Sequence, residues 1–339
     1  MIRFSRSALV LLLATSFVDA QDKKFEYPWA AKQTADGAKL EYIQGTPVMF
    51  LSGTPKQIGR QQAELAGLQM KPLVKMPKRA VAEMGASKQW PFIVFAANNL
   101  MKQAPKDHVT ELKELIEVGQ HDYQSLMVGN GLIELRRMGG CASFVVMPEK
   151  SKSGKLLFGR NFDFPDFDVL HKYHCVFVVK PTGKHAFVSI GYPGLVGVIS
   201  GINDAGLAVA TLDVYRTGDG SPQFNAMGCP LAMTYRRILE ECTTVAEAQK
   251  ILEESPRTTY MNLVVCDAKT ARTFELSPKQ VGVREPEDSV LGCTNHFRVK
   301  GMFANETCWR YDALKKLREN TPQFDVKSVH KAMHAVNQG

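Results

Sequence analysis

The chain has 339 residues, with 42 Lys and Arg against 34 Asp and Glu, and 45% of its residues are hydrophobic. This composition allows a sizeable core and excludes a disordered, collagen-like or coiled-coil protein. The excess positive charge is scattered in short pairs without interleaved aromatic residues, so no nucleic-acid partner is expected. Beyond the N-terminus no apolar stretch approaches the ~20 residues that span a bilayer, which predicts a globular protein without a membrane span.

The first twenty residues have the pattern of a secretory signal peptide. Arg3 and Arg6 precede an apolar run over residues 8–18, and short residues follow at 18–20. The run is too short to cross a bilayer, and no cysteine follows that could carry a lipid. We therefore expect residues 1–20 to be removed and the mature protein to be secreted or periplasmic.

Helical signals dominate the segment before residue 140. Thr54, Pro55 and Gln57 supply a capping hydroxyl, a proline at the first helical position and the glutamine of a capping box, which predicts a helix start. An apolar face further on predicts a helix that runs to a break at 128–131. The residues of this face are Leu112, Leu115, Ile116, Tyr123, Leu126 and Met127.

After residue 140 the pattern changes to short apolar runs separated by turn residues, which predicts a meander of antiparallel strands. The expected strands are 142–147, 155–162, 175–180, 186–190, 196–202 and 207–212. Residues 230–254 predict one or two helices. A hairpin of 262–266 with 271–276, a strand at 290–294 and helices at 307–318 and 326–336 complete the predicted elements.

Seven cysteines, at positions 141, 175, 229, 242, 266, 293 and 308, are unusual for an exported protein because their number is odd. No C-x-x-C pair occurs among them, so neither a zinc site nor another metal site is expected. At least one thiol lacks an intramolecular disulfide partner.

The junction Gly139-Gly140-Cys141 points to Cys141 as that thiol. Glycines allow the strained turn that brings the thiol against the carbonyl of Gly140, the geometry for an acyl shift followed by hydrolysis. Self-cleavage there gives Cys141 a free α-amino group, whose ordinary pKa is ~7.7–8.0, as a base on the nucleophile's own residue. The alternative is a buried cysteine at a strand start after a flexible turn.

Four segments, in this order, resemble a known family: 52–59, the junction at Cys141 with 159–163, 200–207, and 293–297. They are similar to the linear-amide branch of the N-terminal nucleophile (Ntn) hydrolases. The closest resemblance is to the acyl-coenzyme A:6-aminopenicillanate acyltransferase-like peptidase family, with choloylglycine hydrolases and acid ceramidases as relatives. The likeness covers roughly residues 45–310.

The resemblance implies roles for five residues. Cys141 matches the nucleophile, and Arg160 and Asp163 match residues that orient it, Arg160 by favouring thiolate and Asp163 by holding the amine. Asn203 matches an oxyanion-hole donor. Asn295 matches a second active-site asparagine that binds either the α-amino group or the oxyanion. Without the resemblance, Arg160 and Asp163 could form a surface ion pair and Asn203 could be an ordinary turn residue.

The implied fold is α+β, an αββα sandwich of two antiparallel sheets flanked by helices, in one domain over 21–339. Cleavage between Gly140 and Cys141 would divide it into a helical segment 21–140 and a catalytic segment 141–339. The implied function is hydrolysis of linear, non-peptide amides through an acyl-thioester, without a cofactor. Acyl transfer to an amine is the close alternative. The expected partner is a small N-acyl amide, and a homo-oligomer is compatible with the sequence.

Two other classes remain open. A papain-like thiol protease would need a histidine within hydrogen-bond reach of Cys141 and would keep the bond between residues 140 and 141 intact. Against it, Cys141 opens a predicted strand, so no helix dipole lowers the pKa of its thiol. A non-catalytic exported binding protein could use the same sandwich, with the motifs incidental.

Overall fold

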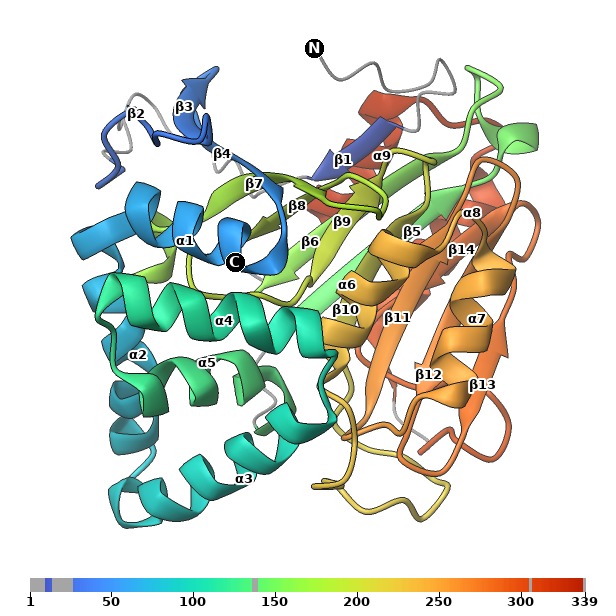
Figure 1. The fold of residues 1–339 in the computed structure, drawn as a ribbon. Helices are drawn as coiled ribbons and strands as arrows, with labels where there is room; N and C mark the ends of the chain where they lie inside the picture. Colours follow the sequence, from blue (N-terminus) through green and yellow to red (C-terminus); the bar gives the residue numbers. More distant parts are fainter. Residues whose placement is uncertain (1–9, 14–26, 136–139, 305–306, 338–339) are drawn as a thin grey trace.

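The computed structural model describes residues 10–13, 27–135, 140–304 and 307–337. Within these residues the strands form a ten-stranded sheet, in the order β13-β12-β11-β10-β9-β8-β7-β4-β3-β2, and a four-stranded sheet, in the order β1-β6-β5-β14 (Figure 1). The large sheet comprises β2 (Lys32–Gln33), β3 (Lys39–Ile43), β4 (Thr46–Gly53), β7 (Cys175–Pro181), β8 (Phe187–Gly191), β9 (Ser200–Asn203), β10 (Ala208–Asp213), β11 (Met261–Cys266), β12 (Ala271–Leu276) and β13 (Val281–Arg284). The small sheet comprises β1 (Val10–Leu13), β5 (Gly140–Val146), β6 (Leu157–Asp163) and β14 (Val290–Cys293).

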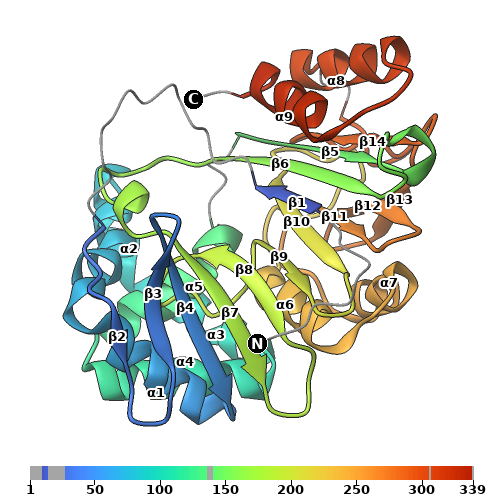
Figure 2. The same ribbon diagram turned by 90° about the horizontal axis from the view of Figure 1, so that it is seen from above.

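Helices cover the outer faces of both sheets (Figure 2). A large apolar core lies between the large sheet and its helices, and a smaller one lies between the small sheet, α8 and α9. The helices are α1 (Pro55–Ala66), α2 (Lys71–Glu83), α3 (Trp90–Gln103), α4 (Lys106–Gly119), α5 (Tyr123–Leu135), α6 (Leu231–Glu241), α7 (Val245–Glu254), α8 (Trp309–Asn320) and α9 (Val326–Ala335).

A third core joins the two sheets, and the alternation of side chains along β5 explains how Cys141 reaches it. Cys141 and Val145 pack toward β10 and β11, whereas Ala142, Phe144 and Val146 pack toward α8 and α9. Both faces of β5 are therefore buried, as expected for a strand covered by a sheet on one side and by helices on the other. This alternation places the Cys141 side chain between the two sheets.

The predicted α+β class is confirmed, but the expected pair of purely antiparallel sheets is wrong in two respects. β4 pairs with β7 and β1 pairs with β6, and both pairs are parallel. The sheets are also unequal, and the small one lies over the β10–β12 end of the large one, so the sandwich is only partial (Figure 2). The predicted strands after residue 140 otherwise match observed strands, although β9 is shorter than predicted.

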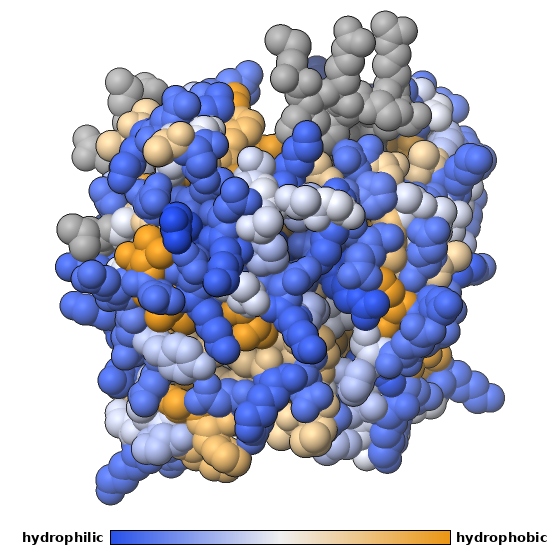
Figure 3. Space-filling model, in the orientation of Figure 1, coloured by the Kyte–Doolittle hydropathy of each residue, from blue (hydrophilic) through white to orange (hydrophobic). Residues whose placement is uncertain are grey.

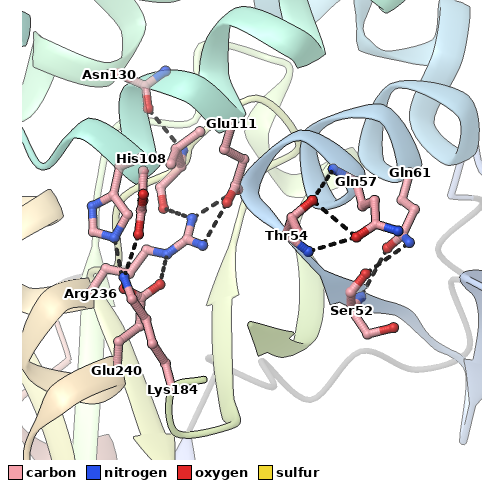
Figure 4. Close-up of polar contacts among 12 residues, drawn as sticks. Ser52, Thr54, Gln57, Gln61, His108, Glu111, Asn130, Lys184, Arg236 and Glu240 are labelled. Atoms are coloured by element: carbon pink, nitrogen blue, oxygen red, sulfur yellow. Dashed lines mark hydrogen bonds and ion pairs between the residues drawn. The ribbon is translucent and has the colours of Figure 1, made fainter. Parts of the chain in front are cut away.

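The segment 21–140 differs from the purely helical prediction because it also supplies β2, β3 and β4. The helix start at Thr54 is confirmed, with both hydrogen bonds of the capping box present (Figure 4). The predicted break at 128–131 is wrong. The chain breaks at Gln120, which has a φ of 51°, and α5 runs through 128–131. Gly129 and Gly131 face α2 and α3, where a Cβ atom would lie at ordinary contact distance from Pro77 and Leu100.

Hydrophilic side chains cover most of the surface in the view of Figure 3, with apolar patches toward its lower edge, where α3 lies. On α3 the side chains of Phe92 and Phe95 are exposed. Within the described residues, no helix combines the length and apolar character needed to cross a membrane.

Candidate active site

Cys141 is the second residue of β5, and its buried side chain lines a cavity of about 110 Å³. β5 and β6 pair so that Cys141 lies opposite Phe162 and Gly140 lies opposite Asp163. The predicted pairing of the Cys141 strand with the strand of Arg160 and Asp163 is therefore confirmed. It places Asp163 opposite Gly140, the residue before Cys141. The strained turn is expected at residues 139 and 140. Residue 139 lies outside the described residues, and Gly140 is the first residue of β5.

Arg160 is buried beside the thiol. Its Nη2 atom lies 3.9 Å from Sγ of Cys141 and donates a hydrogen bond of 2.7 Å to the backbone oxygen of Thr211 on β10. The guanidinium also lies over the ring of Phe162, with 4.5 Å between the guanidinium carbon and the ring centre. A fixed positive charge at this place favours the thiolate form of Cys141.

Burial has the largest effect on the pKa of the Cys141 thiol and raises it to about 11. The charge of Arg160 lowers this pKa, whereas the carboxylates of Asp213 and Asp163 raise it. At neutral pH the thiol of the uncut chain is therefore protonated. A nucleophilic role requires a nearby group that takes up the thiol proton.

Asn295 and Arg310 hold the backbone of Cys141. Asn295 Oδ1 accepts a hydrogen bond of 2.7 Å from the backbone nitrogen of Cys141. Arg310 donates from Nη1 to the backbone oxygen of Cys141 and from Nη2 to Asn295 Oδ1, both at 2.7 Å. Asn295 Nδ2 donates to the backbone oxygen of Asp213 at 2.8 Å. Of the two roles expected for Asn295, this geometry matches the one in which it binds the nitrogen of Cys141.

Sequence reasoning does not find Arg310 or Asp213. Arg310 is buried on α8, but the same helix carries other basic residues, such as Lys315, and no sequence pattern distinguishes it from them. Asp213 ends the apolar strand β10 and is buried. A carboxylate at the end of a mostly apolar strand is a signal that could have identified it, because buried charges need a partner or a function.

Asn203 does not belong to the site. Its Nδ2 donates to the backbone oxygens of Leu239 and Cys242 at the end of α6, at 3.0 and 2.7 Å. Its Oδ1 accepts hydrogen bonds from the backbone nitrogens of Ala205 and Leu207. The amide group therefore holds a turn against α6, and it is not among the residues that line the Cys141 cavity. The expectation that Asn203 supplies an oxyanion donor is wrong.

The cavity beside Cys141 has a largely apolar lining. Helices α2 and α5 supply one side, and the loops after β6 and β8 supply another. Its apolar members include Leu73, Met76, Pro77, Leu126, Phe162, Phe164, Leu170, Pro193, Leu195 and Ile199.

Tyr192 supplies a phenol group to the cavity lining. Burial, followed by the charge of Asp166, raises the pKa of Tyr192 to about 12, while Arg160 lowers it. The phenol therefore keeps its proton at neutral pH and can donate a hydrogen bond into the cavity. This makes Tyr192 a candidate for the donor position that Asn203 does not fill.

The described residues that line the cavity include no histidine. This arrangement disagrees with a papain-like thiol protease, which needs an imidazole base beside the thiol. The described residues also contain no group of three or more His, Cys, Asp and Glu side chains placed to hold a metal ion. The charged groups that shift the pKa of the Cys141 thiol are instead Arg160, Asp163 and Asp213.

Comparisons with solved structures give distant similarities. An N-acylethanolamine-hydrolyzing acid amidase ortholog of Caenorhabditis elegans is 19% identical, with a TM-score of 0.46, over 57% of this chain and 85% of that one. A variant of the conjugated bile acid hydrolase of Clostridium perfringens is 14% identical, with a TM-score of 0.31, over 59% and 72% of the two chains. The penicillin V acylase of Agrobacterium tumefaciens is 17% identical, with a TM-score of 0.26, over 46% and 45%.

Sequence comparisons identify the family. An uncharacterized protein of Archaeoglobus fulgidus is 27% identical over 206 residues, which are 52% of this chain and 34% of that protein. The chain thus spans about a third of the length of this relative. The acyl-coenzyme A:6-aminopenicillanic acid acyl-transferase family matches residues 149–338, which include Arg160, Asp163 and Asn295 and begin after Cys141. Because this match covers more than half of the chain, the protein belongs to the acyl-coenzyme A:6-aminopenicillanic acid acyl-transferase family.

Proposed function

We propose that the protein is an autoprocessed Ntn cysteine hydrolase that cleaves the linear, non-peptide C–N amide bond of N-acyl substrates. The observation that carries this proposal is the set of contacts around Cys141. Its backbone nitrogen and oxygen are bound by Asn295 and Arg310, and its thiol lies beside Arg160 at the end of an apolar cavity. A merely structural cysteine needs no such contacts.

The first step in this proposal is cleavage of the chain before Cys141. Sγ attacks the carbonyl carbon of Gly140, the C–N bond breaks, and the departing nitrogen of Cys141 takes up the thiol proton. Water then hydrolyses the thioester, which leaves a carboxylate on Gly140 and a free thiol on Cys141. Asn295 Oδ1 already accepts a hydrogen bond from this nitrogen in the uncut chain, so it is placed to hold the new amine.

In turnover the new α-amino group acts as the base. It accepts the thiol proton while Sγ attacks the acyl carbon of the substrate, and the amine product leaves with that proton. The Arg160 charge stabilises the developing thiolate, and the protonated Tyr192 phenol donates to the developing oxyanion. Water releases the acyl group from the thioester and regenerates the enzyme.

The size and apolar lining of the cavity favour a substrate whose acyl group is small and apolar. Its volume is about 110 Å³, and its lining includes Leu73, Leu126 and Phe164. An apolar cavity of about 150 Å³ in another protein binds benzene, so a cavity of this size suits a short alkyl or small aromatic group.

Acyl transfer is the second candidate, because the family that matches residues 149–338 is described as an acyl-transferase. Hydrolysis and transfer share every step up to the thioester and differ in whether water or an amine reaches it. Turnover in the presence of hydroxylamine separates them. A transferase forms mainly the hydroxamate, whereas a hydrolase forms mainly the free acid.

Intact-mass analysis tests the proposed function. The purified protein should give two chains that separate before Cys141, and the second should begin Cys-Ala-Ser-Phe. The Cys141→Ala variant should remain one uncut chain without amidase activity. A wild-type protein that stays uncut while hydrolysing amides at full rate would contradict the proposed mechanism, and an uncut, inactive protein would favour the binding-protein alternative.

We further propose that residues 1–20 are a signal peptide and that the mature protein is exported. The support is the charge and apolar pattern of the first twenty residues. In the structure Val10–Leu13 pairs with β6, so removal of the signal would free this edge of the small sheet. N-terminal sequencing of protein from the medium or periplasm should begin at Gln21, and a chain that still begins at Met1 would contradict this proposal.

A further inference from the structure

One wall of the cavity is built from a segment without regular secondary structure. Residues 192–196, between β8 and β9, form this wall segment, and Tyr192, Pro193, Gly194 and Leu195 all line the cavity. An irregular segment has no ladder of hydrogen bonds to fix its shape, so its buried backbone groups need other partners.

Three buried side chains supply those partners. Gln62 Oε1 on α1 accepts a hydrogen bond of 2.7 Å from the backbone nitrogen of Gly194. Asn130 on α5 donates from Nδ2 to the backbone oxygen of Gly194 and accepts at Oδ1 from the backbone nitrogen of Val196, both at 2.8 Å. Arg236 Nη1 on α6 donates to the backbone oxygen of Val196 at 3.0 Å. Asn130 and Arg236, which both bind the backbone of Val196, are labelled in Figure 4.

Packing also fixes the wall segment. Gly194 has a φ of +93°, and a Cβ atom there would lie 2.9 Å from Met70 and 3.0 Å from Leu126. A side chain at this position would therefore be strained and would displace its neighbours. The wall segment has little room to move while its backbone hydrogen bonds are made.

Arg236 is in turn held by two carboxylates. Its guanidinium donates to Glu111 on α4 at 2.6 Å and to Glu240 on α6 at 2.8 Å (Figure 4). The backbone oxygen of Val196 is therefore held by a buried ionic cluster, whereas the Gly194 backbone and the Val196 nitrogen are held by two neutral amides. Gln62 and Asn130 both belong to the segment 21–140, so that segment contacts the wall segment directly.

We propose that Gln62 and Asn130 are positioning residues that set the shape of the acyl cavity, and that the segment 21–140 thereby determines which acyl groups reach Cys141. This inference rests on the proposed function for the identity of the ligand. Neither side chain lines the cavity, so both act through the backbone of the wall segment and through Tyr192 and Leu195.

A matched pair of variants tests the proposal. Asn130→Leu removes the two hydrogen bonds that Asn130 makes with the wall segment. Asn203→Leu removes an equally buried asparagine that holds a different loop and does not line the cavity. Both variants should lower the melting temperature. Only Asn130→Leu should change the ratio of kcat/KM for acetyl and hexanoyl amides of 7-amino-4-methylcoumarin, by about tenfold.

A second pair keeps the test valid if Asn130→Leu does not fold. Gln62→Met removes the acceptor for the Gly194 nitrogen at similar side-chain size, and Gln62→Glu restores an acceptor there. The acyl preference should shift in Gln62→Met and return toward the wild-type ratio in Gln62→Glu. An unchanged ratio in Asn130→Leu and Gln62→Met, or an equal change in Asn203→Leu, would overturn the proposal.

A readout without turnover separates failure of this inference from failure of the proposed function. The relative rates at which N-methylmaleimide and N-phenylmaleimide modify Cys141, located by mass spectrometry, report the shape of the cavity. The proposal expects this ratio to change in Asn130→Leu and not in Asn203→Leu. Absence of amide turnover by the wild type would count against the proposed function, whereas an unchanged labelling ratio would count against the wall-segment inference.

Discussion

The surroundings of Cys141 have two sides that differ in their chemistry. Arg160, Asn295 and Arg310 contact Cys141 itself, and all come from the segment 141–339. The other side is the apolar lining of the cavity. Both segments contribute to it, with Leu73 and Leu126 on α2 and α5 and Ile199 from the segment 141–339. The polar side makes directional hydrogen bonds of 2.7 Å, whereas the apolar side offers only shape.

This difference predicts that the two sides have different functions. Hydrogen bonds to Cys141 tolerate little displacement, because their energy depends steeply on distance and angle. Substitution of one apolar side chain by another of similar volume in the cavity wall changes the free energy of unfolding only modestly, and the wall still excludes water. We therefore expect variants of the polar side to affect the rate of reaction and variants of the apolar side to affect the choice of acyl group.

The largest effect is expected from Arg310→Leu on the polar side. This change leaves the backbone oxygen of Cys141 and Oδ1 of Asn295 without their charged donor. We expect self-cleavage and amide turnover to fall by about a thousandfold, because the charge-assisted hydrogen bonds that fix the nucleophile are lost. Lys315→Leu removes an exposed charge from the same helix and should leave both rates unchanged. A cut and active Arg310→Leu protein would contradict this assignment of the polar side.

A smaller effect is expected at Tyr192, which lines the cavity and carries a polar group. Tyr192→Phe removes only the phenol oxygen, and the ring still fills the cavity wall. If the phenol donates to the oxyanion, kcat should fall by about a hundredfold with little change in KM, while self-cleavage before Cys141 continues. Steady-state kinetics on one N-acyl amide measure this. An unchanged kcat would mean that Tyr192 contributes shape alone and belongs with the apolar side.

Local sequence patterns predict the part of the fold in which partners are close along the chain. The hairpin of β5 and β6 follows from two apolar runs separated by turn residues, and it also brings Arg160 to Cys141. The parallel pairing of β4 with β7 joins strands more than a hundred residues apart, and no local pattern encodes it. The strands β2, β3 and β4 escape prediction because strong helical signals follow them directly.

The same limit applies to the site, as the two asparagines show. Asn203 ends the short strand β9, and Asn295 lies two residues after the short strand β14, so the sequence around them predicts similar roles. In the structure Asn203 contacts the end of α6, and Asn295 contacts Cys141. The neighbour that decides the role comes from a distant part of the chain in both cases. Arg310 is missed for the same reason.

A change confined to the apolar side should alter selectivity with little loss of rate. Leu73 and Val74 are adjacent buried residues of α2, but only Leu73 lines the cavity. Both Leu73→Ala and Val74→Ala should destabilise the protein, by about 1–3 kcal/mol. Only Leu73→Ala should increase kcat/KM for a hexanoyl amide relative to an acetyl amide, by roughly tenfold. Equal acyl profiles in the two variants would show that α2 does not contact the acyl group.

The smallest effect concerns the ionic cluster that joins the two segments behind the cavity (Figure 4). His108 on α4 lies 3.0 Å from Glu240 on α6, and Arg236, Glu111 and Lys184 complete the cluster. Burial, followed by the charge of Arg236, lowers the pKa of His108 despite the favourable contact with Glu240. Within the described residues, the Nδ1 atom of His108 has no hydrogen-bond partner, which fits a neutral imidazole.

A histidine with a lowered pKa in the folded state makes the protein less stable in acid. Below pH ~6.5 the unfolded chain binds a proton at His108 that the folded chain does not bind, so the free energy of unfolding falls as the pH falls, by at most ~1.4 kcal/mol per pH unit. His108→Gln should flatten this slope, and His330→Gln, an exposed histidine on α9, should not. Urea unfolding between pH 7.5 and 5 measures the slopes. The Cys141→Ala background is suitable because an uncut chain permits two-state analysis. Equal slopes in both variants would mean that the pKa of His108 is the same in the folded and unfolded chains, and a steeper slope in His108→Gln would mean that the folded protein holds this histidine protonated.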